Sequence, residues 1–229
     1  MKVGIVIFPG SNCEGDAFHA VVDQLGEDAV MLWHKDHNLR GSDVIILPGG
    51  FSYGDYLRAG AIARFSPIMA EVAAHAKKGG IVLGICNGFQ IACEAGLLPG
   101  ALLRNDVGYR SMPVTIRVEH TNTAFTSAAK VGQCLTMPIA HGEGRFAASE
   151  DVLDELENSE QVLFKYVDAA GNTTVAANPN GAMRNIAGVC NAKRNVIGLM
   201  PHPERAVDLL LGSEDGLVLF ESLLVAAHA

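Results

Sequence analysis

The stretch IVLGICNGFQ (residues 81–90) joins a buried strand to the start of a helix, with Cys86 at the junction. Residues 81–85 are apolar on both faces, which is typical of a central parallel strand. Gly84 and Gly88 lie two residues before and after Cys86, the spacing of a nucleophile elbow. At so sharp a turn the backbone is strained and neighbouring chain passes where a Cβ would clash, which favours glycine. The pattern predicts a nucleophilic cysteine, although a buried cysteine between two packing glycines would also fit.

The first half of the chain repeats this alternation of strand and helix. Continuous apolar runs at residues 3–8, 29–33 and 44–47 predict buried strands, and helical patterns at 15–25 and 67–78 lie between strands. Strands that alternate with helices need crossover connections, so the sheet is expected to be parallel here.

The second half has a different character. Residues 114–119 and 162–167 alternate like strands with one wet face, and residues 186–189 and 196–200 read as a hairpin. These segments predict a small antiparallel portion. A last helix is expected from Ser213, as its N-cap, to about residue 227. No repeat or linker divides the chain, so residues 1–229 are predicted to form a single domain.

Composition excludes several classes of function. The net charge of −8 offers no electrostatic footprint for nucleic acid or an anionic membrane. No apolar run approaches the roughly 20 residues of a membrane span, and no signal peptide is recognisable, so a cytoplasmic location is expected. The five cysteines include no CxxC pair, which argues against a disulfide scaffold or a zinc site, and no metal is expected.

An oxyanion hole can be placed beside the predicted nucleophile. The backbone N–H of Asn87 opens the helix and therefore lacks an intrahelical partner. Gly49 and Gly50 follow the strand at 44–47 and end at the same edge of a parallel sheet as Cys86. We expect Gly50 N–H and Asn87 N–H to form the hole, although residues 48–50 could equally be an ordinary Pro-Gly turn.

A nucleophilic thiol needs a base, and the base needs a group that orients it. In MPHPER (residues 200–205), His202 lies between two prolines and Glu204 follows the second, and an extended chain would point both side chains the same way. His141 and Glu143 have the same spacing but are flanked by glycines, and they remain a rival pair. Neither pair has further residues at metal-ligand spacing.

Seven motifs in order resemble the class I (triad) glutamine amidotransferases, and among them the glutaminase subunits of phosphoribosylformylglycinamidine synthase. The resemblance spans essentially the whole chain. The motifs are FPGSNCEGD (8–16), PGGFSYGDYLRAGAIAR (48–64), GICNGFQ (84–90), GLLPGAL (96–102), PIAHGEGR (138–145), NPNG (178–181) and MPHPERA (200–206).

The resemblance implies a flavodoxin-like α/β fold with a mostly parallel central sheet flanked by helices. It implies a Cys86, His202 and Glu204 triad that hydrolyses L-glutamine to glutamate and ammonia for de novo purine biosynthesis. It also implies a large ATP-dependent synthetase subunit and a small accessory subunit as partners. ATP and Mg would be used by the large subunit, with no cofactor in this chain.

Some assignments stay open at the level of sequence. Gln90, Gly49 and His141 are candidates for binding substrate, although Gln90 could equally only pack the helix. The arginines at 58, 145 and 205 could bind either the substrate carboxylate or the partner subunit. A Cys-His hydrolase of the related peptidase-like group, or a glutaminase that serves another synthetase, would share the elbow.

Overall fold

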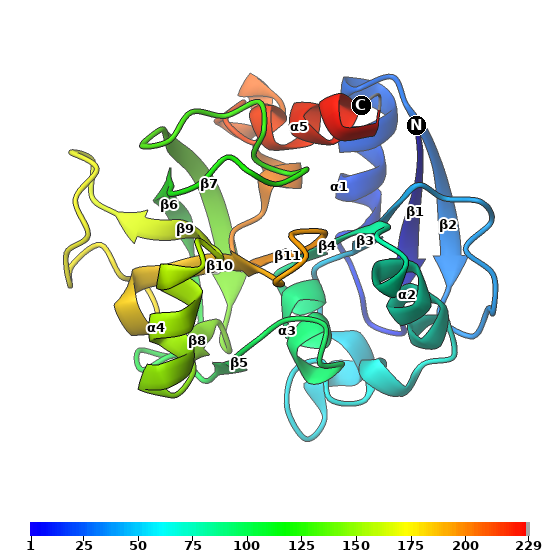
Figure 1. Cartoon of the computed structure of the whole chain (residues 1–229), viewed down its shortest axis with the longest axis horizontal. Coiled ribbons are helices and arrows are strands. Elements are labelled where there is room, and N and C mark those ends of the chain that lie inside the picture. The colour runs from blue at the N-terminus through cyan, green and yellow to red at the C-terminus, as the bar shows by residue number, and fades with distance from the viewer. Residues whose placement is uncertain (228–229) are drawn as a thin grey trace.

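A nine-stranded sheet forms the centre of the molecule, as the computed structural model of residues 1–227 shows (Figure 1). Its strand order is β2-β1-β3-β4-β11-β10-β9-β6-β7. The first five strands in this order pair in parallel; they are β2 (Asp28–Trp33), β1 (Lys2–Ile7), β3 (Val44–Leu47), β4 (Ile81–Ile85) and β11 (Val196–Leu199). The predicted parallel strands are therefore confirmed.

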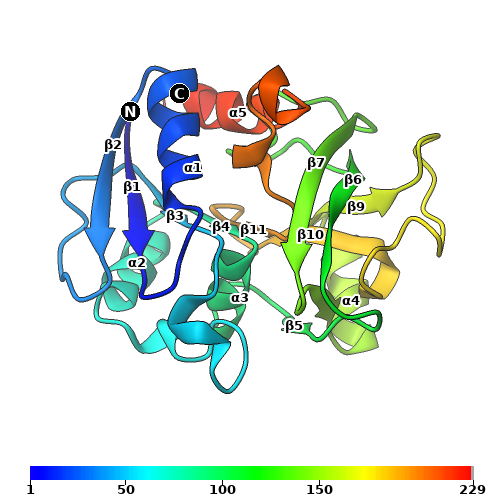
Figure 2. The ribbon, with the colours of Figure 1, turned by 180° about the vertical axis from the view of Figure 1, so that it is seen from behind.

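The other end of the sheet is antiparallel. The strands are β10 (Ile186–Cys190), β9 (Val162–Val167), β6 (Arg110–Val118) and β7 (Cys134–His141). Figure 2 shows β6, β7 and β9 at the end opposite β1 and β2. The predicted hairpin is the β10–β11 pair. A separate two-stranded sheet joins β5 (Ala101–Leu103) to β8 (Arg145–Ala147).

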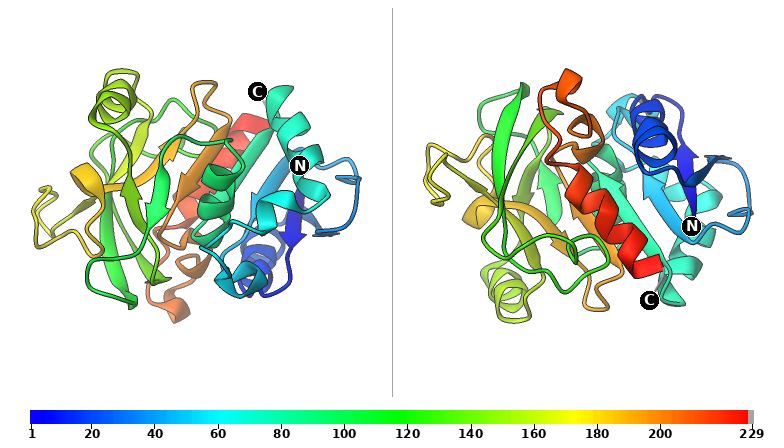
Figure 3. Two further views of the ribbon diagram at one scale, coloured as in Figure 1. Left: turned by 90° about the horizontal axis from the view of Figure 1, so that it is seen from below. Right: turned by 90° about the horizontal axis from the view of Figure 1, so that it is seen from above.

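Helices cover both faces of the parallel strands. The helices are α1 (Glu14–His19), α2 (Ile68–Lys77), α3 (Asn87–Glu94), α4 (Glu150–Asn158) and α5 (Leu217–Ala227). In Figures 1 and 3, α1 and α5 lie on one side of the sheet and α2 and α3 on the other. The inner parallel strands β3, β4 and β11 are buried almost throughout, which is why their sequences are apolar, whereas the edge strand β2 stays partly exposed.

Two predicted helices differ from those observed. The helix expected over residues 15–25 is α1 followed by a π-helical segment, Ala20–Gln24. The last helix begins at Leu217 rather than at Ser213, because Ser213 Oγ donates a hydrogen bond to Thr136 O (2.8 Å). The chain then turns at Gly216, where a Cβ would lie 2.1 Å from the Pro203 carbonyl oxygen.

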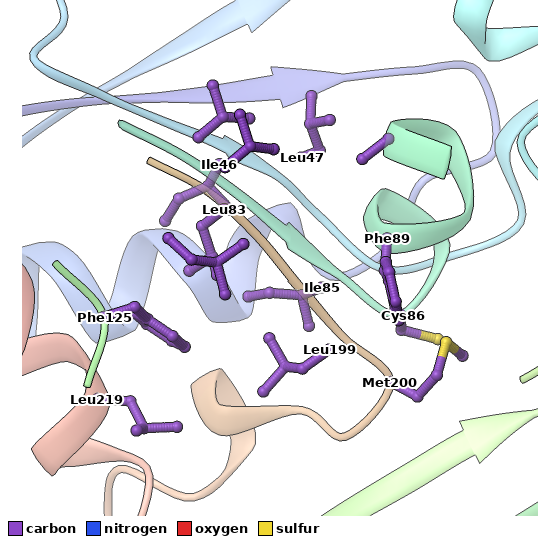
Figure 4. Packing of buried hydrophobic residues seen from close by; sticks show 14 of the residues in the cluster. Ile46, Leu47, Leu83, Ile85, Cys86, Phe89, Phe125, Leu199, Met200 and Leu219 are labelled. Atoms are coloured by element: carbon purple, nitrogen blue, oxygen red, sulfur yellow. The ribbon is translucent and has the colours of Figure 1, made fainter. Parts of the chain in front are cut away.

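The core brings the strand that precedes Cys86 into contact with both helical layers. Figure 4 shows Leu83, Ile85 and Leu199 among the buried apolar side chains, with Cys86 next to Met200 where the strands end. The carboxyl edge of β4 is thus held rigidly by packing, and the residue that follows β4 inherits a fixed position.

Candidate active site

Cys86 occupies the strained turn that its flanking glycines predict. Its φ is +51° and its ψ is −105°, a backbone conformation that non-glycine residues rarely adopt and that costs about 1–3 kcal/mol. A Cβ at Gly88 would lie 1.8 Å from the Leu47 carbonyl oxygen, and one at Gly84 would lie 2.7 Å from the Gly88 carbonyl oxygen. The elbow therefore requires glycine at both positions because β3 and the first turn of α3 pass so close.

His202 and Glu204 lie beside this elbow as a buried pair. His202 Nδ1 and Glu204 Oε1 are 2.6 Å apart, and each residue is about 1% exposed. His202 is extended, but Pro203–Arg205 form a 3₁₀ turn, so the extended geometry predicted through Glu204 is wrong. The Glu204 carboxylate reaches the ring because the turn folds back on His202. As the hydrogen-bond acceptor, this carboxylate keeps a proton on His202 Nδ1.

The surroundings of His202 favour its charged form. Burial opposes that form, but the charges of Glu204 and Cys86 outweigh burial and raise the pKa of His202 well above its ordinary value. With Nδ1 held by Glu204, Nε2 is the free nitrogen, and it has no hydrogen bond of ordinary geometry within residues 1–227. The Cys86 Sγ lies 3.9 Å from the Ala140 carbonyl oxygen at the same place. This is an arrangement that can carry a thiolate–imidazolium pair.

The rival imidazole has a different environment. His141 is buried, and its Nδ1 lies 3.2 Å from Asn105 Nδ2 rather than beside a carboxylate. Glu143 Oε2 instead accepts a hydrogen bond from Ala59 N (3.1 Å). Burial, and then the nearby charge of His202, lower the pKa of His141 to about 4, so this ring stays neutral near pH 7.

The two expected oxyanion donors lie at the sheet edge beside the thiol. Within residues 1–227, neither Gly50 N–H nor Asn87 N–H donates to a protein acceptor. Gly50 has φ +136°, and a Cβ there would lie 2.6 Å from Asn12 N. The Asn87 side chain ties the two segments together, because its Oδ1 accepts a hydrogen bond from Ser52 N (3.0 Å). The sequence patterns did not predict this hydrogen bond between Ser52 and Asn87.

A cavity of about 330 Å³ opens beside the thiol. Cys86, Gln90, Gly50 and His141 line it, as expected of residues near a substrate. Gly49 does not line the cavity: it backs the base, since a Cβ there would lie 2.7 Å from His202 Cε1. Gly49 thus packs against the base, and its contact with substrate stays a prediction.

The arginines proposed for the substrate carboxylate are also placed elsewhere. Arg58 pairs with Glu94, Arg145 with Asp106 and Arg205 with Asp16, all outside this cavity. Among the described residues, Arg104 is the arginine that lines it. Arg104 follows a short strand, and nothing in the sequence around it indicates a substrate-binding residue.

Cys13 is a second thiol that sequence reasoning did not single out. It is 2% exposed, and Arg205 Nη2 donates a hydrogen bond to its Sγ (3.0 Å). Cys13, His202 and Glu204 bring possible metal-ligand atoms within 4.8 Å of one another. The guanidinium of Arg205 and the His202–Glu204 hydrogen bond both oppose a cation at this point. Burial raises the pKa of the Cys13 thiol, which keeps it neutral.

Among the described residues, no helix is both long and apolar enough to cross a bilayer.

Comparison with known proteins identifies the family. Residues 1–214 match the model of the CobB/CobQ-like glutamine amidotransferase domain. The chain is 60% identical over 225 residues to phosphoribosylformylglycinamidine synthase subunit PurQ of Chlorobaculum tepidum, covering 97% of this chain and 96% of the relative. It is 54% identical over 224 residues to the protein of that name from Salinibacter ruber, covering 97% and 95%.

Solved structures agree with the sequence comparisons. The structure described as PurLQS from Thermotoga maritima superposes with a TM-score of 0.87 at 43% identity, covering 99% of this chain and 98% of the other. A glutamine amidotransferase from the same organism shares the fold at 16% identity, with a TM-score of 0.61 and coverage of 99% and 97%. The predicted fold class is confirmed, and the chain belongs to the CobB/CobQ-like glutamine amidotransferase family.

Proposed function

We infer that this chain is the glutaminase subunit of phosphoribosylformylglycinamidine synthase. It hydrolyses L-glutamine to glutamate and ammonia for the step of purine biosynthesis that converts formylglycinamide ribonucleotide to the amidine. The observation that carries this inference is the buried His202–Glu204 pair beside the Cys86 elbow, in a chain 54–60% identical to subunits of that name.

The chain works within a complex. Its partners are the large synthetase subunit and the small accessory subunit, a proposal supported by the similarity to the PurLQS structure. We assign the use of ATP and Mg to the large subunit, with no cofactor in this chain. We further propose that residues 1–229 make up one glutaminase domain and that the complex works in the cytoplasm.

The triad assignment rests on geometry. His202 Nε2 takes the proton of Cys86, and the thiolate attacks the side-chain amide carbon of glutamine. Gly50 N–H and Asn87 N–H stabilise the tetrahedral oxyanion, each contributing about 3 kcal/mol as such donors do elsewhere. His202 then gives the proton to the leaving nitrogen, and ammonia departs from a thioester on Cys86.

Hydrolysis of the thioester reuses the same groups. His202 removes a proton from a water molecule, which attacks the thioester carbon, and the second oxyanion is held by the same two amides. The thiolate leaves and recovers the proton, so that glutamate is released. Glu204 acts through His202 in both halves, because its carboxylate stabilises the imidazolium that forms each time.

Two comparisons within the assembled complex test this scheme. Cys86→Ala should abolish release of glutamate from glutamine while ammonia-dependent synthesis by the large subunit continues. His202→Ala should be as damaging as Cys86→Ala, whereas His141→Ala should retain the chemistry at a changed KM. Full glutaminase activity of Cys86→Ala, or loss of chemistry only in His141→Ala, would overturn the assignment.

Two other functions are separated by substrate. A Cys-His hydrolase of the peptidase-like group would cleave peptides, and a glutaminase for another synthetase would not activate this large subunit. Hydrolysis of free glutamine but not of glutamine within a peptide, together with amidine formation in the reconstituted complex, supports the subunit proposed here.

A further inference from the structure

Two carboxylates line the same cavity as the thiol, and the proposed chemistry uses neither. Asp55 comes from the loop after β3, and Glu143 from the turn between β7 and β8. Both residues line one cavity, and burial, then the like charge of Glu143, raise the pKa of Asp55 to about 6.

Asp55 is anchored to the nucleophile elbow. Asn87 Nδ2 lies 3.4 Å from Asp55 Oδ1, and Asn87 directly follows Cys86. The same amide group donates to Gln90 Oε1 (2.8 Å), and Gln90 in turn donates to the Glu143 carbonyl oxygen. This chain of contacts fixes both acidic residues relative to the thiol.

The negative charge of this pair is poorly compensated by the protein. Glu143 Oε2 accepts a hydrogen bond from Ala59 N, and its Oε1 lies 3.7 Å from Arg104 Nε. The Arg104 side chain is 89% exposed, so solvent screens it strongly. Two half-buried carboxylates facing one solvated cation make a cavity that attracts a further positive charge.

A second observation marks this cavity as built for a ligand. His141 also lines it, is only 3% exposed, and has an Nε2 without a hydrogen-bond partner among the described residues. Buried polar atoms are normally paired, so a ligand or its bound water is expected to satisfy this one.

We propose that Asp55 and Glu143 bind the α-ammonium group of glutamine and so select the free amino acid as substrate. The inference rests on the glutaminase function proposed above. When the amide carbon of glutamine reaches Cys86 Sγ, its only cation is the α-ammonium group. Bound between the two carboxylates, that cation removes their mutual repulsion.

The same contact accounts for the rejection of peptides. A glutamine residue within a peptide carries no α-ammonium charge, so its binding would leave both carboxylates unpaired in the cavity. A site built to pair a charged group discriminates strongly against an analogue that lacks it. The acidic pair therefore separates this enzyme from a peptidase that has a similar elbow.

The test compares two substrates in the reconstituted complex. One is L-glutamine and the other is 4-carbamoylbutanoate, which is glutamine without its α-amino group. Asp55→Asn preserves the shape of the side chain and removes its charge. It should lower kcat/KM for glutamine by about 10- to 100-fold, mainly through KM, as expected for loss of a charge-assisted hydrogen bond. Hydrolysis of the deaminated analogue should change by less than about threefold.

Two further variants make the test selective. Glu143→Gln should act in the same direction, and Asp106→Asn, a carboxylate outside this cavity that pairs with Arg145, should leave both substrates unaffected. Alkylation of Cys86 by iodoacetamide reports on the elbow and should proceed in Asp55→Asn as in the wild type.

The outcomes distinguish this inference from the function on which it rests. If wild-type complex hydrolyses glutamine but Asp55→Asn lowers the rates for both substrates equally, ammonium recognition is refuted while the glutaminase function stands. An unchanged KM for glutamine in Asp55→Asn would refute it too. If the wild-type complex hydrolyses neither substrate, the glutaminase proposal itself fails.

Discussion

Replacing Glu204 by glutamine tests how much of the chemistry depends on one buried charge. Glutamine has the size of glutamate, so the contact with His202 Nδ1, 2.6 Å in the wild type, keeps its length but loses its charge. Both residues are about 1% exposed, so solvent cannot replace the lost carboxylate. Burial would then dominate, and the pKa of His202 should fall below its wild-type value.

The size of the effect follows from the burial of the pair. Removing one partner of a buried ion pair costs about 3–5 kcal/mol, and here that cost falls on the imidazolium formed when Cys86 loses its proton. At 1.36 kcal/mol for each factor of ten, kcat for glutamine hydrolysis should fall by about 10²- to 10⁴-fold. KM should change little, because Glu204 does not line the cavity beside the thiol.

Two measurements check this prediction. Glutamate release by the assembled complex gives kcat and KM, and the rate of Cys86 alkylation by iodoacetamide between pH 5.5 and 8 reports the thiolate. Glu204→Gln should slow alkylation most at the acidic end, where the wild-type imidazolium holds the thiolate. Glu214→Gln, an exposed carboxylate on the same segment, is the control. A kcat within threefold of wild type, with an unchanged alkylation profile, would refute the triad reasoning.

Three shorter predictions follow from other contacts. Gly88→Ala should destabilise the fold by about 3 kcal/mol in chemical denaturation, because its Cβ would lie 1.8 Å from Leu47 O, whereas Gly15→Ala, with open space around it, should be nearly neutral. Cys13→Ser should keep glutaminase activity within about fivefold, since a neutral thiol is no nucleophile; a loss equal to that of Cys86→Ala would contradict this. Asp55→Asn should stabilise the protein by about 1 kcal/mol at pH 7.5 after allowance for its exposure, and not at pH 3.5. The sign follows because the pKa of this carboxyl rises from 3.8 in the unfolded chain to about 6 in the folded protein, so the wild-type protein loses stability as pH rises through that interval. A variant less stable than the wild type at pH 7.5 would contradict this prediction.

The parallel half of the fold and the elbow were predictable because their signals are local. Strands buried on both faces appear in the sequence as continuous apolar runs. The glycines around Cys86 are required because a Cβ at either position would clash with nearby backbone. Strand β7 was not predicted from the sequence, although its residues alternate between buried and exposed. Helix α4 was not predicted either, although two acidic residues follow the N-cap Ser149, and Leu153 and Leu156 are spaced to face the core. These two elements had a readable pattern.

The cavity could not be read in the same way. Asp55, Arg104 and Glu143 come from three segments that meet only when the β7–β8 turn folds over the loop after β3. Each looks like an ordinary surface charge in sequence, because nothing within several residues of it demands that residue type. Their function depends on tertiary proximity, which composition and periodicity do not encode.

The two His-x-Glu segments show where spacing alone stops being informative. Both offer an imidazole and a carboxylate two residues apart, and both lie near Cys86 in the fold. In one, the 3₁₀ turn at Pro203–Arg205 returns the carboxylate to its own histidine, and the charge raises the pKa of that ring. In the other, Glu143 turns away to Ala59 N, and the pKa of His141 falls to about 4. The same residue spacing therefore yields one ring suited to hold a proton during catalysis and one suited to remain neutral, and the direction of a single carboxylate decides which is which.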